Sequence, residues 1–310
     1  MGVGRIDRAF AAVSDSADAE EVSGPVRERG TDGHMHPGGD RDPRRRGRGG
    51  GALMPFLVAG HPDLAATEAT IEAIAAAGAQ AIELGIPFSD PIADGPVIAE
   101  AMHAALRHGA TPEAILAMVR RLRAGSGQAR DLPIIAMVSI SIVDRIGRDR
   151  FVGDLASAGI DGLIVPDLDL DEAPALRGSC DRAGISFALL IAPTTPQSRA
   201  AQIAGLCSGF VYVLARTGIT GERGALPAGL PARIAALRAA TPLPLAVGFG
   251  ISTPEQVRDV LAVAEGAIVG SALVRRIEEA HGRGDDVAVE AARFVELLVT
   301  GASAPAEAPP

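Results

Sequence analysis

Short apolar runs alternate with segments of helical spacing along most of this chain. Runs of this length without polar alternation are typical of strands buried on both faces, and each is followed by an apolar pattern with the period of a helix. Eight strand–helix units of this kind predict a parallel sheet closed into a single α/β domain, the (β/α)8 or TIM barrel. The expected strands are 53–58, 81–84, 134–139, 162–165, 187–191, 210–214, 245–247 and 267–269, and the expected helices are 64–77, 97–123, 148–158, 171–183, 196–206, 228–239, 253–263, 271–280 and 285–299. A doubly wound open sheet is the alternative, but no Gly-x-Gly-x-x-Gly turn follows the first strand.

The barrel pattern does not extend over the whole chain. Residues 1–13 carry a short helical pattern, and residues 52–300 form the predicted catalytic domain. Between them, residues 14–51 are rich in Gly and Arg and contain almost no large apolar side chain, which predicts a disordered insertion before the first strand. We expect the tail, residues 301–310, to be frayed.

Composition narrows the class of protein. The chain has 310 residues, 47% of them hydrophobic, and a net charge of −9, so nothing favours a nucleic-acid or anionic-membrane partner. No apolar run approaches the length of a membrane span or a signal peptide, which predicts a cytoplasmic protein. We expect Cys180 and Cys207 to be buried free thiols rather than a disulfide.

The absence of lysine excludes whole classes of mechanism. All 29 basic residues are arginine. A Schiff-base aldolase or an enzyme with its own pyridoxal phosphate needs a lysine amine, so neither chemistry is open to this chain. The six histidines do not converge in the sequence pattern, and we predict no metal site.

The stretch 83–96, Glu-Leu-Gly-Ile-Pro-Phe-Ser-Asp-Pro-Ile-Ala-Asp-Gly-Pro, contains three carboxylates in an otherwise apolar connection. Glu83 is expected at the end of the second strand, and Asp90 and Asp94 lie in the loop that follows. Apolar surroundings raise the pKa of a carboxyl group toward the range useful for general acid–base catalysis. The alternative is a turn whose aspartates only cap helices.

Glycines follow the last two predicted strands. Gly248 and Gly250 follow the seventh strand, and Gly270 with Ser271 opens the helix after the eighth. Main-chain N–H groups and the positive end of a helix bind anions, and barrels commonly bind phosphate at this place. The pattern favours a phosphate site, although the glycines could serve tight turns alone.

The string from Glu83 to Pro96 closely resembles the signature of the tryptophan synthase alpha subunit family, and motifs after strands 1, 6, 7 and 8 match as well. The family cleaves indole-3-glycerol phosphate to indole and glyceraldehyde 3-phosphate. The resemblance implies that Glu83 donates a proton to indole C3 and takes one from the glycerol hydroxyl, and that Asp94 interacts with the indole N–H. No cofactor is implied in this chain. The implied partner is a beta subunit that carries pyridoxal phosphate, in an alpha2-beta2 heterotetramer.

Further roles carry over only through the resemblance. It implies an indole pocket, a phosphate cradle, a closing loop and a partner interface. The indole pocket is implied at Phe56, Tyr212, Phe249 and Ser139, and the phosphate cradle at Gly218, Gly248, Gly250, Gly270 and Ser271. The closing loop is implied at Arg216 and Thr220, and the partner interface at Asp90 and Pro91.

Strand 3 departs from the family pattern. The family has a tyrosine at the end of this strand and an asparagine two residues on, where this chain has Ser139 and Ser141. Substrate fit and coupling to a beta subunit are both open as a result. Two other functions remain alternatives: a catalytically weakened regulatory subunit that docks on and activates a beta subunit, and another phosphate-binding barrel enzyme.

Overall fold

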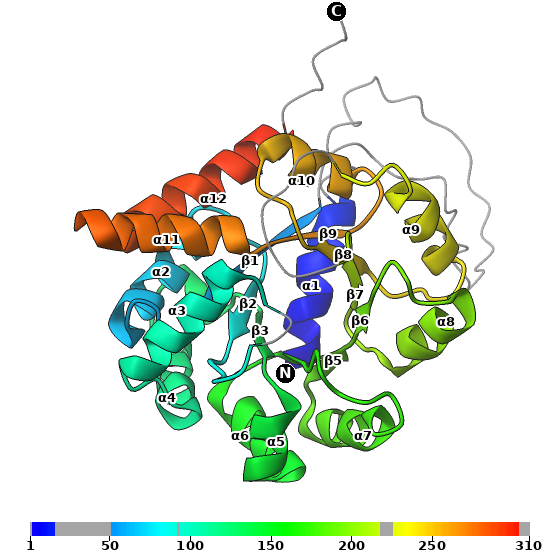
Figure 1. Ribbon diagram of the computed structural model, residues 1–310, viewed down its shortest axis with the longest axis horizontal. Helices are drawn as coiled ribbons and strands as arrows, with labels where there is room; N and C mark the ends of the chain where they lie inside the picture. Colours follow the sequence, from blue (N-terminus) through cyan, green and yellow to red (C-terminus); the bar gives the residue numbers. More distant parts are fainter. Residues whose placement is uncertain (1, 16–50, 92–93, 218–225, 304–310) are drawn as a thin grey trace, which may run out of the picture.

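The computed structural model describes residues 2–15, 51–91, 94–217 and 226–303, and its centre is a parallel barrel surrounded by helices (Figure 1). The strands are β1 (Ala52–Val58), β2 (Ile82–Gly85), β3 (Ile134–Met137), β4 (Gly162–Ile164), β5 (Ser186–Ala188), β6 (Leu190–Ile191), β7 (Val211–Leu214), β8 (Leu245–Gly248) and β9 (Gly266–Val269). Their order is β5-β4-β3-β2-β1-β9-β8-β7-β6, with every pairing parallel. The two ends of this order, β5 and β6, are consecutive in the chain, so the sheet curls into a nearly closed barrel. The predicted TIM barrel is confirmed, and the open-sheet alternative is wrong.

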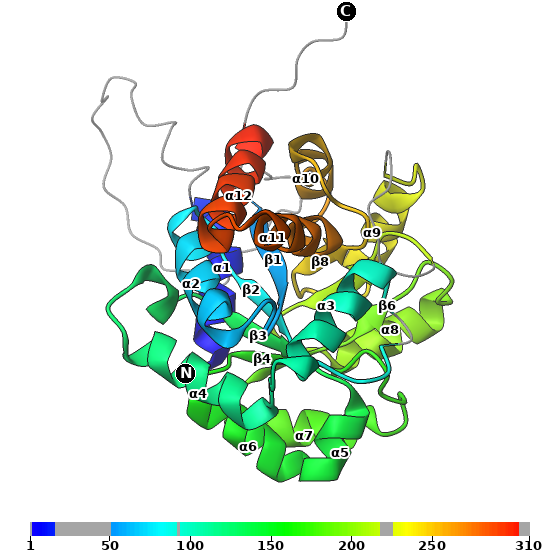
Figure 2. The ribbon, with the colours of Figure 1, turned by 60° about the vertical axis from the view of Figure 1, so that its left-hand side comes forward.

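Helices cover the outside of the barrel. They are α2 (Leu64–Ala76), α3 (Pro96–Arg107), α4 (Pro112–Ala124), α5 (Ile140–Ile146), α6 (Arg148–Ala158), α7 (Ala173–Ala183), α8 (Gln197–Leu206), α9 (Leu230–Arg238), α10 (Pro254–Leu261), α11 (Ser271–Arg283) and α12 (Val287–Ser303), with a 3-10 turn, η1, at Gln128–Arg130. The last helix, α12, packs against α2, α10 and α11 (Figure 2). It continues through Ser303, beyond the predicted start of the tail, and residues 304–310 lie outside the described residues.

Three predicted elements differ from the structure. The helix expected over 97–123 is two helices, α3 and α4, because the chain turns at Gly109 with a φ of 79°. The third strand ends at Met137, and Ser139 caps α5, a helix that the sequence pattern did not reveal. The fifth strand is divided into β5 and β6, which gives nine strands instead of eight.

The N-terminal helix α1 (Gly2–Asp15) closes the bottom of the barrel (Figure 1). Its Ile6 and Phe10 pack with inward side chains such as Met54 and Ile164, and the Phe10 ring lies 5.8 Å from the ring of Phe210. Burial of these apolar side chains fixes the helix to the barrel floor. The predicted insertion, 14–51, falls almost entirely on residues 16–50, which lie outside the described residues, so its character stays a prediction.

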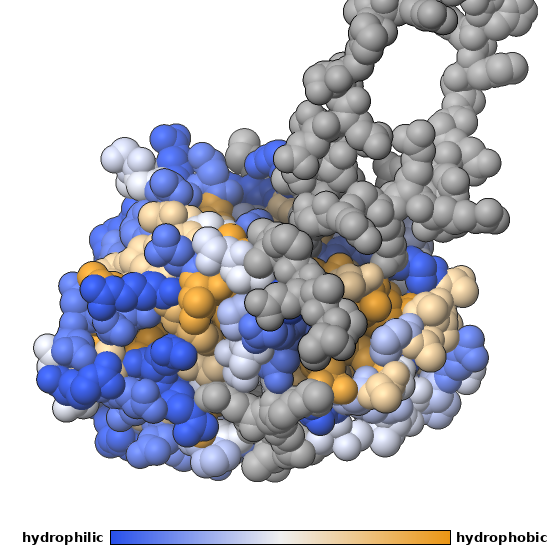
Figure 3. All heavy atoms as spheres, turned by 90° about the horizontal axis from the view of Figure 1, so that it is seen from above, coloured by the Kyte–Doolittle hydropathy of each residue, from blue (hydrophilic) through white to orange (hydrophobic). Residues whose placement is uncertain are grey.

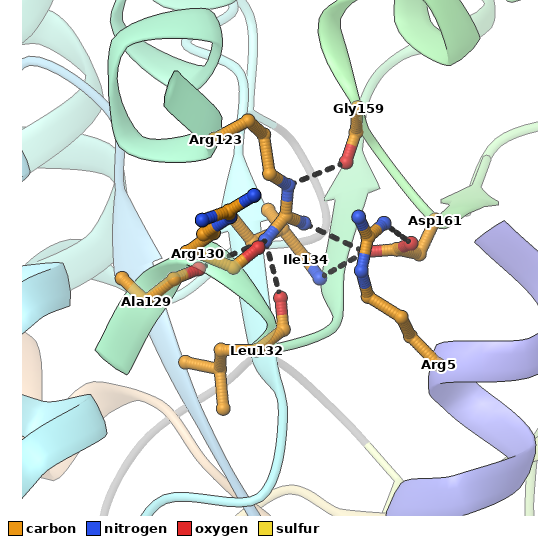
Figure 4. A network of polar contacts seen from close by, with 8 residues as sticks. All are labelled: Arg5, Arg123, Ala129, Arg130, Leu132, Ile134, Gly159 and Asp161. Atoms are coloured by element: carbon orange, nitrogen blue, oxygen red, sulfur yellow. Dashed lines mark hydrogen bonds and ion pairs between the residues drawn. The ribbon is translucent and has the colours of Figure 1, made fainter. Parts of the chain in front are cut away.

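Asp161 links α1 to the barrel at the same end. Its side chain is fully buried immediately before β4, and one carboxylate oxygen accepts a hydrogen bond of 2.7 Å from Arg5. The other accepts bonds from Arg123 at 2.7 Å and from the Ile134 N–H at 2.9 Å (Figure 4). Burial raises the pKa of Asp161, whereas the two arginines and the Ile134 N–H act to lower it. This network joins elements far apart in the sequence.

On the face shown in Figure 3, hydrophilic side chains surround separate hydrophobic patches. Two large hydrophobic side chains, Val289 and Leu297 on α12, are exposed. Cys180 and Cys207 are buried and free, as predicted. Within the described residues, no helix combines the length and apolar character needed to cross a membrane.

Candidate active site

A cavity of about 840 Å³ opens at the carboxyl ends of the strands. Its walls are mostly apolar, and β1, β2, β7 and the loops after β3, β4, β8 and β9 all contribute to it. Apolar concave pockets with a few convergent polar groups are the usual form of small-molecule sites. Most of the predicted site residues line this cavity, namely Phe56, Glu83, Asp90, Pro91, Asp94, Ser139, Tyr212, Phe249, Gly250, Gly270 and Ser271.

Strand alternation explains why these side chains point inward. Ala81 belongs to the packed interior of the barrel, so Glu83, two residues on, faces the same side of β2. Phe56 likewise lies two residues after the inward-facing Met54 on β1, so it faces the same side of its strand. The strand register pairs Phe56 with Glu83. Glu83 therefore projects into the cavity from within β2, which continues to Gly85, one residue beyond the predicted 81–84.

Glycine is required where aromatic rings approach the strands. A Cβ on Gly85 would lie 2.7 Å from Cζ of Phe56, and a Cβ on Gly248 would lie 2.5 Å from the Tyr212 hydroxyl. Both distances are shorter than real contacts. Gly248 thus makes room for Tyr212, although it is not itself among the residues that line the cavity.

Glu83 is a buried carboxyl without a hydrogen-bond partner among the described residues. Its side chain lies in a residue only 1% exposed, and neither carboxyl oxygen is bonded. Burial, and then the neighbouring Asp94 carboxyl, raise the pKa of Glu83 from 4.5 to about 8. At neutral pH the group is therefore mainly protonated and can donate a proton.

Asp94 has a different environment. It lies in the connection between β2 and α3, where its backbone N–H donates to the Pro91 carbonyl, and it is partly exposed. Burial raises the pKa of Asp94 to about 6. Two carboxyl groups with pKa values on either side of 7 provide an acid and a carboxylate in one cavity.

Tyr212 belongs to the same group of side chains. It is buried in β7, and burial followed by the charges of Glu83 and Asp94 raises its pKa well above 10. Its phenol therefore stays protonated throughout the neutral range. Tyr212, Glu83 and Asp94 all line the same cavity.

Phe249 and Gly250 follow β8 in left-handed backbone. Their φ values are 78° and 85°, and Phe249 is the one described residue other than glycine with positive φ. A bulky side chain in this region is strained, and such strain tends to occur at functional sites. The turn brings both residues into the cavity wall.

The helix α11 begins at the cavity. Gly270 is its N-cap, and Gly270, Ser271 and Ala272 line the wall beside Phe249 and Gly250. No side chain caps this helix, so its first N–H groups and its positive end face the cavity. This is a suitable place for an anion.

Several candidate residues stay outside this constellation. Arg216 follows β7 but is not among the lining residues, whereas Gly218 and Thr220 lie outside the described residues. Sequence reasoning missed apolar wall residues, among them Ile98 and Met102, which the amphipathic spacing of α3 could have revealed.

Asp167 is a further polar wall residue that sequence analysis did not assign to the site. It follows β4, and its carboxylate accepts hydrogen bonds from the Ser139 hydroxyl at 2.6 Å and from the Ile140 N–H at 2.9 Å. Because these partners follow β3, the contact depends on the neighbouring positions of two strands and has no local sequence signal.

Known proteins resemble this chain along most of its length. A family model for the tryptophan synthase alpha chain matches residues 44–301. The tryptophan synthase alpha chain of Geobacter sp. strain M21 is 43% identical over 262 residues, covering 84% of this chain and 96% of the relative. That of Synechococcus sp. strain CC9902 is 46% identical over 248 residues, covering 80% and 90%.

Solved structures agree with these relatives. Tryptophan synthase subunit alpha from Legionella pneumophila superposes with a TM-score of 0.78 at 29% identity, covering 96% of this chain and 98% of that one. A chain of Mycobacterium tuberculosis tryptophan synthase gives a TM-score of 0.73 at 33% identity, covering 82% and 93%. This chain therefore belongs to the tryptophan synthase alpha chain family, lyases of tryptophan biosynthesis that cleave indole-3-glycerol phosphate to indole and glyceraldehyde 3-phosphate.

Proposed function

We propose that Glu83 and Asp94 carry out the family's cleavage reaction in this chain. The observation that supports this most is the unpaired, buried carboxyl of Glu83, with a pKa of about 8, in a cavity that also holds Asp94, with a pKa of about 6. At pH 7 the first is mainly an acid and the second mainly a carboxylate. A retro-aldol cleavage of an indole ring uses this combination.

The reaction begins with a proton transfer to carbon. The Glu83 carboxyl gives its proton to indole C3, and the positive charge that develops at the ring nitrogen is stabilised by the Asp94 carboxylate at the N–H. The Glu83 carboxylate then takes the proton of the glycerol hydroxyl next to C3. The bond from C3 to the glycerol carbon breaks, its electron pair returns to the ring, and the hydroxyl oxygen becomes the aldehyde oxygen of glyceraldehyde 3-phosphate. Glu83 ends the cycle protonated, and no metal or cofactor is required.

The phosphate is proposed to bind at the glycines after β8 and β9. Gly250, Gly270 and Ser271 line the cavity where α11 begins, and Gly248 allows the Tyr212 ring to pack beside this turn. Main-chain N–H groups and a helix N-terminus bind phosphate without a lysine. We propose that Gly218 completes this cradle.

The indole ring is proposed to occupy the apolar part of the cavity. Phe56, Tyr212 and Phe249 contribute aromatic rings to this wall, and Ser139 adds a small side chain after β3. Aromatic and aliphatic walls exclude water and strengthen the electrostatic contacts within.

A beta subunit is the proposed partner, and pyridoxal phosphate is proposed to reside only there, in an alpha2-beta2 heterotetramer of the cytoplasm. Asp90 and Pro91, in the loop at the cavity rim, are the proposed contact with it. Arg216 and Thr220 are proposed to belong to a loop that closes over substrate. The composition favours neither nucleic acid nor membrane as a further partner.

Indole release from indole-3-glycerol phosphate tests this proposal directly. The purified chain alone should release indole, and the rate should rise when a tryptophan synthase beta subunit is added. The variant Asp94→Asn should be slower in both assays because the carboxylate at the ring nitrogen is lost. Activation of a beta subunit without any indole release would instead favour a regulatory subunit.

A further inference from the structure

The cavity has a second polar wall, separate from Glu83 and Asp94. It consists of Ser139, Ser141 and Asp167, which follow β3 and β4 and line the same cavity. The cleavage described above uses none of these groups for proton transfer. Ser139 has a proposed place in the indole pocket, whereas no function has been proposed above for Ser141 or Asp167.

Hydrogen bonds fix this wall in place. The Ser139 hydroxyl donates to Oδ2 of Asp167 at 2.6 Å, and the Ile140 N–H donates to Oδ1 at 2.9 Å. Oγ of Ser139 accepts a bond of 3.2 Å from the Ser141 N–H. A carboxylate can accept about four hydrogen bonds. Asp167 thus keeps acceptor capacity on both oxygens.

The barrel order places this wall opposite the proposed phosphate cradle. Asp167 follows β4 and Gly270 follows β9, and these two strands are four steps apart in the order β4-β3-β2-β1-β9. Four steps are about half of the way round the barrel. Glu83 projects from β2, between the two. A substrate held by its phosphate at Gly270, with its reacting carbon at Glu83, would point the far edge of its ring toward Asp167.

The cavity as a whole is large enough for a substituted indole ring. Its volume of about 840 Å³ lies near the upper end of the range for small-molecule sites, roughly 300–1,000 Å³. Asp167 lines the cavity and is itself exposed. A group bound there must donate a hydrogen bond, because burying a carboxylate against an apolar substituent forfeits its hydration.

We propose that the site also accepts indole rings that carry a hydroxyl or amino group on the six-membered ring, with Asp167 accepting the hydrogen bond from that group. Ser139 acts as a positioning residue, because its hydroxyl holds the carboxylate of Asp167 toward the cavity. The inference depends on the proposed function, since it needs the substrate to lie between Gly270 and Glu83. It makes Asp167 a determinant of substrate range.

The reverse reaction provides the test. In it, C3 of an indole forms a bond to the aldehyde carbon of glyceraldehyde 3-phosphate, the ring proton leaves to Glu83, and the aldehyde oxygen gains a proton. The probes are indole itself and the four hydroxyindoles substituted on the six-membered ring. The quantity compared is the ratio of kcat/KM for each hydroxyindole to kcat/KM for indole.

We expect at least one hydroxyindole to have a ratio above one with the unaltered chain. Asp167→Asn should lower that ratio about tenfold, the typical effect of a hydrogen bond to a charged group. Asp169→Asn is the matched control, because Asp169 is exposed nearby but does not line the cavity, and its ratio should not change. Ser139→Ala should lower the ratio in the same direction, and this second variant keeps the test available if Asp167→Asn does not fold.

Two outcomes separate this inference from the function on which it depends. No condensation of indole itself by the unaltered chain would contradict the proposed function. Normal condensation of indole, with every hydroxyindole below a ratio of one, would overturn the Asp167 proposal alone. A preference that survives both Asp167→Asn and Ser139→Ala would overturn it as well.

Discussion

Two buried carboxyl groups in this barrel, Glu83 in β2 and Asp161 immediately before β4, have opposite surroundings. Asp161 accepts hydrogen bonds from Arg5, Arg123 and the Ile134 N–H, all within 2.9 Å. Glu83 has no hydrogen-bond partner among the described residues, and the charged group that shifts its pKa is another carboxyl, Asp94. One group is paired at the barrel floor, and the other is unpaired at the active cavity.

The comparison shows that burial alone does not identify a reactive carboxyl. Burial disfavours the charged form of both groups, but at Asp161 two arginines and a main-chain N–H oppose this effect. An unpaired buried carboxyl destabilises the fold and is retained where it has a use. The presence or absence of partners therefore separates the structural group from the proposed catalytic one.

The largest expected effect is on catalysis. Glu83→Gln should lower kcat for indole release by about 10²- to 10⁴-fold, the usual contribution of general acid–base catalysis. Glutamine is nearly isosteric but cannot transfer the proton. The control is Asp161→Asn, whose folded fraction should retain most of the activity. A Glu83→Gln variant with normal kcat would remove Glu83 from the mechanism.

The next effect is on stability. Asp161→Ala should lower the free energy of unfolding by about 3–5 kcal/mol, because Arg5 and Arg123 lose their partner in a buried network. Urea unfolding measures this loss. Glu68→Ala is the matched control, since it breaks a more exposed pair with Arg121 and should cost far less. Equal losses in the two variants would contradict the structural role of Asp161.

Glu83→Gln should raise the free energy of unfolding, the opposite of the effect of Asp161→Ala, and the size of this gain should depend on pH. The pKa of Glu83 rises from 4.5 to about 8 on folding, so its favourable contribution is complete below pH 4.5 and is lost as the pH rises through 8. Glutamine cannot ionise, so the variant does not lose this contribution as the pH rises. Its gain in unfolding free energy over the unaltered chain should be near zero at pH 4.5 and on the order of 4 kcal/mol at pH 8. A gain independent of pH would indicate that Glu83 is ionised in the folded protein.

A smaller effect is expected on the pH dependence of the rate. The proposed active form has a protonated Glu83 and an ionised Asp94, so kcat/KM should be greatest between about pH 6 and 8. Beyond each limit it should fall roughly tenfold per pH unit. In Asp94→Asn the acidic limb should disappear and the alkaline limb should remain. Persistence of the acidic limb in that variant would assign it to another group.

Sequence patterns predicted the barrel, and they singled out Glu83 and Asp94 as candidate site residues, because both are local signals. Apolar runs with intervening helices determine the parallel sheet, and Glu83 and Asp94 belong to one short stretch. The division between α3 and α4 was missed because the turn at Gly109 interrupts a continuous amphipathic pattern. The partners of Asp161 and the bond from Ser139 to Asp167 could not be predicted, since each joins residues brought together only by the closed barrel.

The protonation state of Glu83 tests the central claim most directly. Infrared difference spectra of the unaltered chain minus Glu83→Gln, recorded across the neutral range, isolate the carboxyl band of this one side chain. The account predicts a carboxylic acid band at pH 7 that is lost with a midpoint near pH 8 and that is still present in Asp161→Asn. A carboxylate band at pH 7, with a midpoint near the ordinary value for glutamate, would contradict it.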